Sequence, residues 1–300
     1  MTATDTLLRF LLPAAGVRGV AVRLDDTWQA IATRASYPEA ARELLGEAAA
    51  AAALFTGHAK VDGRLSVQLR SNGAIRTLFA ECTAAGTLRG IVRLDPDAPA
   101  PSRDLRALGA GALLAITIEN PALGGGGGEP VRYQGLVAME SGRLDHAFED
   151  YFRQSEQLPT RLLLACDGTR AAGLMLQKLP GDEGDDDGFR RVGALFDTLA
   201  PAELLALPAA EVIHRLFHEE QPQLVGHKPL RFGCSCSPAR VEAMLVSLGR
   251  EEAEAAVHAG DGEAEVTCEF CGQQYRLDLE RVDELFRQAA AEAPAGDTRH

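Results

Sequence analysis

Two closely spaced pairs of cysteines near the C-terminus constrain this chain more than any other feature of its sequence. Cys234 and Cys236 form a C-x-C pair, and Cys268 and Cys271 form a C-x-x-C pair. Four sulfurs from two segments can surround one tetrahedral ion, and Zn²⁺ prefers that geometry with thiolate ligands. Gly272 directly follows the second pair, where a positive φ would allow the tight turn of a metal knuckle. We therefore predict a four-cysteine site that holds one zinc ion.

A structural zinc clip and a redox switch share this ligand set, so the four cysteines alone leave both functions open. Bound metal keeps sulfurs deprotonated, and thiolate is the form that oxidants attack. If the metal leaves, the nearest partners lie within each pair, giving Cys234–Cys236 and Cys268–Cys271. Such small rings fit disulfide geometry poorly, and strained disulfides are easily reduced. His227 or His258 could replace one cysteine, but four sulfurs already complete the site.

The composition indicates a globular protein and disfavours two classes of partner. The chain has 300 residues, 46% of them hydrophobic, which indicates about two domains with a sizeable core. A net charge of −13 opposes non-specific binding to nucleic acid or to anionic membranes. No apolar run approaches the ~18 residues needed to span a bilayer. The N-terminal residues lack a basic start and a cleavage site, so we expect mature, cytoplasmic protein.

The other two cysteines, Cys82 and Cys166, stand alone inside apolar stretches. Six cysteines in a chain of this length are too sparse for a secreted disulfide scaffold. We predict that Cys82 and Cys166 are small buried side chains.

Residues 1–180 alternate strand and helix signals and predict an α+β domain. The sequence Ser36-x-x-Glu39, with Pro38 in the first turn, predicts a capping box that opens an Ala-rich helix to about Phe55. Residues 25–27 could cap a shorter helix. Short connections such as Asn72-Gly73 imply antiparallel pairing rather than a doubly wound sheet. The predicted strands cover residues 17–24, 65–69, 75–82, 91–94, 113–118 and 132–139.

Residues 181–230 predict an acidic spacer and a helical linker. Apolar residues recur at helical spacing from residue 189 to 220, and Pro201 and Pro208 divide them into two or three short helices. Residues 222–231 are expected to form a polar connector. A segment bracketed by weak connections must dock elsewhere to bury its apolar face, and is poised to detach.

Residues 231–300 form the predicted zinc-binding module. The 31 residues between the cysteine pairs leave room for helices over residues 241–248 and 251–259. A short strand over residues 275–279 and a closing helix over residues 282–286 are expected to follow.

Three further motifs carry no chemistry. The glycine run from residue 124 to 128 meets Glu129-Pro130 rather than Gly-Lys-Ser/Thr, so it predicts a connection and not a phosphate loop. The acidic residues 182–187 lack the closing carboxylate of a calcium loop. His214 and His218 lie one helical turn apart, but no other ligands cluster with them in the sequence.

The cysteine spacing and several other stretches together resemble the redox-regulated heat-shock protein 33 family, which are bacterial holdase chaperones. The resemblance covers essentially the whole chain, and the polyglycine insert and the spacer length are its main departures. The matching stretches are Arg132-Tyr-Gln-Gly-Leu-Val, Glu149-Asp-Tyr-Phe-Arg-Gln-Ser-Glu-Gln-Leu-Pro-Thr160, Leu207-Pro-Ala-Ala-Glu-Val, His218-Glu-Glu and Phe232-Gly-Cys-Ser-Cys236.

The resemblance implies a three-part fold and a stress-response chaperone rather than an enzyme. Family members are inactive when reduced and zinc-bound. Oxidation forms the two disulfides, releases zinc, unfolds the linker and lets the protein bind unfolded or oxidatively damaged clients without ATP, often as a homodimer. Carried over, Cys234, Cys236, Cys268 and Cys271 are both ligands and redox sensors.

The sequence disfavours two other classes of protein. A zinc-stabilised nucleic-acid-binding module is disfavoured because residues 231–300 carry seven Arg and fourteen Asp or Glu, a net charge of −7 that repels phosphates. A thiol-disulfide oxidoreductase is disfavoured because its C-x-x-C pair should open a helix, whereas Cys271 leads into Gly272 and a predicted strand.

Overall fold

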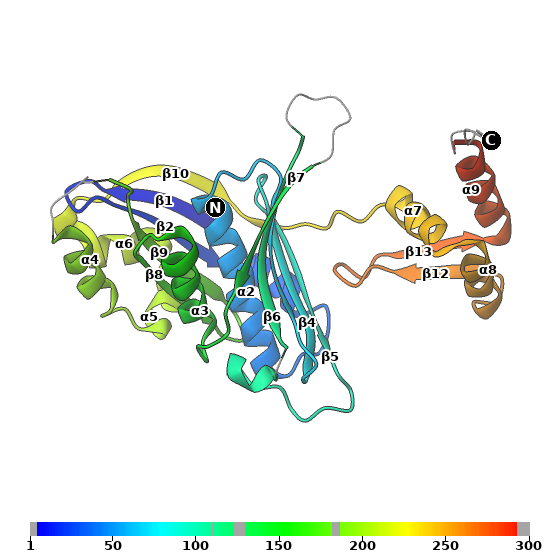
Figure 1. Cartoon of the computed structure of the whole chain (residues 1–300), viewed down its shortest axis with the longest axis horizontal. Coiled ribbons are helices and arrows are strands. Elements are labelled where there is room, and N and C mark those ends of the chain that lie inside the picture. The colour runs from blue at the N-terminus through cyan, green and yellow to red at the C-terminus, as the bar shows by residue number, and fades with distance from the viewer. Residues whose placement is uncertain (1–4, 110, 123–129, 182–186, 293–300) are drawn as a thin grey trace, which may run out of the picture. The chain divides into compact units, whose positions relative to one another are not determined.

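The computed structural model describes residues 5–109, 111–122, 130–181 and 187–292, and the chain divides into two compact units, Met1–Gly233 and Cys234–His300. The predicted polyglycine connection and most of the acidic spacer lie outside the described residues. Antiparallel-rich sheets, helices and a C-terminal cysteine cluster confirm the predicted α+β class (Figure 1). The division into a core at 1–180, a linker at 181–230 and a module at 231–300 stays a prediction.

The first unit is built on two sheets whose strands pair antiparallel, apart from the parallel pair β11–β5. The five-stranded sheet has the order β10-β1-β2-β9-β8, with β1 at Thr6–Leu12, β2 at Val17–Leu24, β8 at Thr160–Cys166, β9 at Ala171–Lys178 and β10 at Gln223–Pro229. The six-stranded sheet has the order β11-β5-β4-β3-β6-β7, with β3 at Arg64–Arg70, β4 at Ile75–Thr83, β5 at Thr87–Leu94, β6 at Leu113–Asn120, β7 at Val131–Val137 and β11 at Arg231–Phe232.

The long helix α2 (Glu39–His58) lies between the two sheets (Figure 1). Its alanines from Ala48 to Ala53 are almost completely buried. Small side chains are needed all round this helix because a sheet packs on each side of it. At Gly46 even a Cβ would clash with the Cys166 sulfur, so the contact requires glycine. The Ala-rich sequence thus suits a helix that is buried on every side from Leu44 to Thr56.

Two helices of the first unit begin without the side-chain caps that the sequence predicts. α2 begins at Glu39 with Pro38 as its N-cap residue and without a side-chain cap, so the predicted Ser36 capping box does not form. The short helix α1 (Asp26–Ala32) is also not capped by its own neighbours. Instead the buried Asp5 carboxylate accepts hydrogen bonds from the Thr27 amide at 2.6 Å and from the Asp25 amide. Sequence-local capping rules miss this contact because the acceptor lies about twenty residues away.

Helices α4 (Gly188–Phe196), α5 (Pro201–Ala206) and α6 (Ala209–Phe217) pack on the face of the five-stranded sheet that α2 does not cover. A second apolar cluster forms there, in which the fully buried Phe217 stacks on Phe10 with ring centroids 6.0 Å apart. Arg191 pairs with Glu220 of the 3-10 turn η3 (His218–Glu220) at 2.5 Å. Pro201 and Pro208 separate the three helices, as predicted.

The predicted polar connector after these helices is wrong. Residues 223–229 form β10, an edge strand that pairs with β1 from Thr6↔Pro229 to Leu11↔Gln223. Leu224 and Val225 are exposed on this strand, so the hydrophobic alternation that normally marks a strand is absent. The linker helices are therefore followed by a strand of the sheet on which they dock.

Three shorter helical segments complete the first unit within the described residues. α3 (Leu144–Tyr151) contacts α2 and β8, and the π-helical turn η2 (Phe152–Glu156) continues it. The 3-10 turn η1 (Leu105–Leu108) precedes β6. No helix in these residues is both long and apolar enough to cross a membrane.

The second unit has a small core of its own. Its elements are α7 (Pro238–Leu248), α8 (Arg250–Ala259), β12 (Glu263–Thr267), β13 (Gln274–Asp278) and α9 (Leu279–Glu292). Val241, Leu245, Val257, Leu277 and Leu285 are among the residues that form the core. The hairpin partner β12 was not predicted, because Glu263 and Glu265 alternate with only two apolar residues.

Candidate metal centre

Two irregular segments of the second unit carry the four cysteines. Cys234 and Cys236 lie just before α7, and Cys268 and Cys271 lie on the turn between β12 and β13. That turn is closed by a hydrogen bond of 2.7 Å from the Gly272 amide to the Cys268 carbonyl. Gly272 has φ of 72°, which confirms the predicted positive φ after the C-x-x-C pair.

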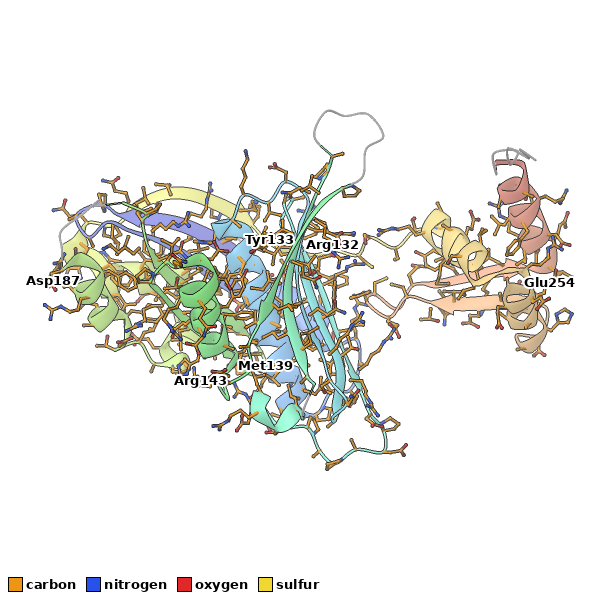
Figure 2. The ribbon with its side chains drawn as sticks, in the orientation of Figure 1. Arg132, Tyr133, Met139, Arg143, Asp187 and Glu254 are labelled. Carbon is orange, nitrogen blue, oxygen red and sulfur yellow. The ribbon has the colours of Figure 1, made fainter. Side chains whose placement is uncertain are left out.

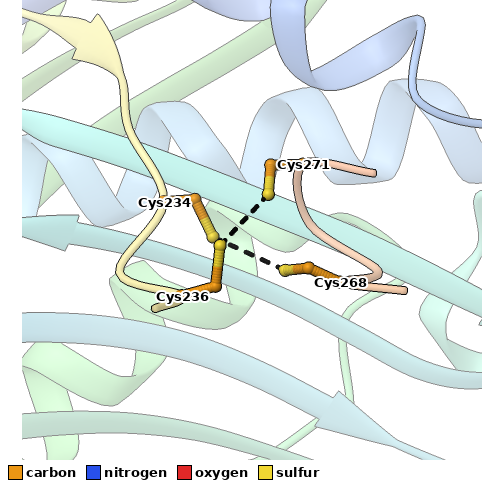
Figure 3. Close-up of side chains that lie close together, drawn as sticks. All are labelled: Cys234, Cys236, Cys268 and Cys271. Atoms are coloured by element: carbon orange, nitrogen blue, oxygen red, sulfur yellow. Dashed lines mark hydrogen bonds between the residues drawn. The ribbon is translucent and has the colours of Figure 1, made fainter. Parts of the chain in front are cut away.

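The four sulfurs converge into one cluster (Figure 3). All lie within 4.8 Å of one another, and the separations are 3.6 Å between Cys234 and Cys268 and 3.3 Å between Cys236 and Cys271. A tetrahedral ion with Zn–S bonds of about 2.3 Å requires sulfurs about 3.8 Å apart. The four thiols thus fit a single ion of this kind, and this is the only such ligand group among the described residues.

The cysteines are present as thiols, without disulfides. The contacts at 3.3 and 3.6 Å each join one cysteine of the first pair to one of the second. A disulfide within either pair would therefore exchange these cross-segment contacts for local bonds. The pairings Cys234–Cys236 and Cys268–Cys271 stay predictions.

Neighbouring side chains set the electrostatics of the metal-free cluster. A hydrogen bond with Tyr275 on β13 lowers the pKa of the Cys236 thiol to about 7, whereas burial raises the pKa of Cys271 to about 12. Burial also raises the pKa of Cys234. Tyr275 was predicted only as a strand residue, because its contact depends on the hairpin that brings β13 beside the first pair.

The basic side chain of Arg240 lies beside the first cysteine pair. Arg240 on α7 donates to the Ser235 carbonyl at 2.9 Å and to its hydroxyl at 2.6 Å, which orders the backbone between Cys234 and Cys236.

The remaining cysteines and histidines do not join the cluster. Cys82 and Cys166 are buried, as predicted, and burial raises the pKa of both thiols, that of Cys82 to about 12. The His214 and His218 rings lie 5.6 Å apart, without a third ligand among the described residues. His258 contacts the Glu254 carbonyl, and neither it nor His227 belongs to the sulfur group.

An antiparallel α+β body followed by a small four-cysteine module defines the class of protein to which this chain belongs. A family model described as Hsp33 protein matches residues 5–278. The chain is 39% identical to the 33 kDa chaperonin of Pseudomonas fluorescens strain SBW25, over 99% of this chain and 98% of that protein. It is 40% identical to the 33 kDa chaperonin of Nitrosococcus oceani, over the full length of both. The chain belongs to the Hsp33 family.

A solved structure shares the fold. The crystal structure of the 33 kDa chaperonin (heat shock protein 33 homolog) from Thermotoga maritima superposes with a TM-score of 0.74, at 21% sequence identity. The match covers 96% of this chain and 100% of that one. The relatives are named as chaperones, which is not a class of enzyme.

Proposed function

We propose that this chain is a redox-regulated, ATP-independent holdase of the cytoplasm, inactive when reduced and zinc-bound. The observation that carries the proposal is the meeting of both cysteine pairs in one cluster of four sulfurs within 4.8 Å. Bound Zn²⁺ would keep these sulfurs as thiolates and tie the segment before α7 to the β12–β13 turn. The partners are unfolded or oxidatively damaged proteins, and the oxidised form acts as a homodimer.

The redox step converts four thiolates into two disulfides, Cys234–Cys236 and Cys268–Cys271. For each disulfide, two thiolates give up two electrons to one molecule of peroxide, which takes up two protons and becomes two waters. The sulfurs then no longer serve as metal ligands. The two oxidations together therefore remove all four ligands.

Loss of the ligands would unfold the second unit, because its core is small and a structural zinc site contributes ~10 kcal/mol or more to folding. Elevated temperature would then release the linker helices and expose the apolar cluster around Phe10 and Phe217. Newly exposed apolar surface is what a holdase offers to an unfolding client.

A paired assay on reduced, zinc-loaded protein tests the proposal. Peroxide is added at elevated temperature while free zinc, free thiols and the aggregation of an unfolding client are followed without ATP. We expect release of about one zinc per chain and loss of about four thiols. Client protection should appear at the same time and be reversed by reductant. Zinc release without client protection would contradict the switch and leave a structural clip.

Two variants distinguish the role of the four clustered cysteines from that of the buried cysteines. Cys268→Ser should bind zinc weakly and lose oxidative control, because one of the four ligands is gone. Cys82→Ser is the matched control, since Cys82 is buried in the first unit and should keep zinc affinity and activation. Unchanged zinc affinity in Cys268→Ser would contradict the assignment of all four cysteines as ligands.

The oxidoreductase alternative is not favoured by the geometry of the C-x-x-C pair. Cys268 and Cys271 lie on a hairpin turn that leads into β13, not at the N-terminus of a helix.

A further inference from the structure

A cavity of about 280 Å³ opens in the first unit at the C-terminal end of α2. Phe55, Ile116 and Phe152 contribute apolar walls, and the Phe55 and Phe152 rings meet edge to face at 5.3 Å. Arg18 and His58 contribute polar groups. The π-helical turn η2 supplies part of the wall, and π-turns are rare and occur mostly at functional positions.

Arg18 is the least satisfied group of this cavity. Its Nη2 donates to Gln177 Oε1 at 2.5 Å and contacts His58 Nε2 at 3.1 Å. Its Nε is buried and has no hydrogen-bond partner among the described residues. Burial lowers the pKa of Arg18, and within the described part of the chain no carboxylate lies at ion-pair distance from it. A half-buried guanidinium without an anion is costly, because buried charges are normally paired.

The residues around Arg18 do not neutralise its charge. His58 Nε2 accepts the arginine hydrogen bond, so the ring is neutral, and burial lowers its pKa to about 3. Glu156, the acidic residue of the lining, is exposed; its negative charge partly offsets the effect of burial on the pKa of Arg18, but the two side chains form no ion pair. Tyr133 on β7 (Figure 2) and Tyr151 place their hydroxyls 3.3 Å apart on the same lining. The cavity thus combines one unpaired cation, two hydroxyls and an aromatic wall.

We propose that this cavity binds a small carboxylate with an aromatic or aliphatic body. The carboxylate would pair with the Arg18 guanidinium, and the apolar body would lie among Phe55, Ile116 and Phe152. The cavity is at the lower limit of ligand pockets, roughly 300 Å³, which restricts the ligand to a small monoanion. All these residues lie in the first unit, so the site shares no residue with the cysteine cluster.

Calorimetric titration of the reduced, zinc-loaded full chain with 3-phenylpropanoate tests the site. The neutral alcohol 3-phenylpropanol keeps the ring and removes the charge, and acetate keeps the charge and removes the ring. We expect each to bind at least about 10-fold more weakly than 3-phenylpropanoate, since both halves of the ligand contribute. Equal binding of the alcohol, or no binding of 3-phenylpropanoate up to 10-millimolar order, would overturn the proposal.

Three variants locate the binding. Arg18→Gln should weaken 3-phenylpropanoate at least about 10-fold. Glu156→Gln removes the competing negative charge at the rim and should tighten binding about two- to five-fold at low salt. Arg70→Gln is the matched control, because Arg70 is exposed on β3 and does not line the cavity, and it should leave the affinity unchanged.

Circular dichroism checks that each variant folds. If Arg18→Gln does not fold, the affinity of Glu156→Gln for 3-phenylpropanoate and the weaker binding of 3-phenylpropanol test the proposal. Unchanged or weaker binding in Glu156→Gln, or unchanged binding in a folded Arg18→Gln, would overturn the assignment to this cavity.

Discussion

The buried His58 ring makes the stability of the first unit depend on pH in the acid range. Burial, with Arg18 as a second cause, lowers the pKa of His58 to about 3, well below the value near 6.5 of an unfolded chain. The neutral ring therefore contributes stability that is present above about pH 6.5 and is lost as the pH falls toward 3. We expect the free energy of unfolding to fall by a few kcal/mol across this range from His58 alone.

Urea unfolding followed by Trp28 fluorescence measures this effect. Trp28 is the only tryptophan and is fully buried in the first unit, so its emission reports that unit alone. Glu47 acts in the opposite direction, because burial raises its pKa to about 7 and its contribution grows as the pH falls from 7 toward 4.5. The comparison with His58→Gln isolates the histidine, since glutamine keeps an acceptor for Arg18. An identical pH slope in this variant would contradict the assignment.

At the scale of single residues, the sequence predicts the cysteine cluster but not its surroundings. The spacing within each pair, Cys234–Cys236 and Cys268–Cys271, is local and is typical of a four-ligand metal site. The Tyr275 contact to Cys236 depends on a hairpin, and the Arg18–His58 contact joins residues 40 positions apart. Such partners depend on the tertiary fold and leave no mark in the neighbouring sequence.

At the scale of elements, α6 determines how firmly the linker helices are docked. Phe217 is fully buried and stacks on Phe10, so Phe217→Ala should weaken docking by about 3–5 kcal/mol. We expect reduced Phe217→Ala to protect a client partly without oxidant, and its residues 189–217 to exchange amide hydrogens faster.

Hydrogen exchange with peptide resolution, together with the client assay, checks this prediction. Leu224→Ala is the control, because Leu224 is exposed on β10 and loses little burial. Unchanged exchange in residues 189–217 of folded Phe217→Ala would show that α6 does not hold the linker. Exchange in β10 reports separately whether release of the helices also breaks the β1–β10 pairing.

The strands that were predicted and those that were missed differ in how they are buried. β2 and β3 follow an alternating or continuous apolar pattern between turn signals, and β2 has the predicted bounds Val17–Leu24. β9 is buried on both faces over most of its length, so its sequence lacks the two-residue period. β10 is an exposed edge strand with Gly226 and Pro229, which mimics a connector.

At the scale of the whole molecule, the two units should lose structure under different conditions. The first unit buries most of the apolar core, whereas the second has a small core and the candidate metal ligands. A strong chelator added to reduced protein should therefore unfold the second unit and leave Trp28 emission unchanged. Far-UV circular dichroism should fall by the contribution of α7, α8 and α9.

Cys268→Ser provides the comparison, because it should show the reduced helical signal before any chelator is added. A shift of Trp28 emission at the same chelator concentration would contradict independent unfolding of the two units.

The pairing of β1 with β10 also fixes an order of events during synthesis. Thr6 meets Pro229, so the first strand to leave the ribosome waits for a neighbour made more than two hundred residues later. Contacts so distant in sequence close slowly, and an open strand edge invites wrong partners in the meantime. The linker helices are translated just before β10, and the cysteine module follows them. One edge of β1 therefore stays open until nearly all of the first unit has been made.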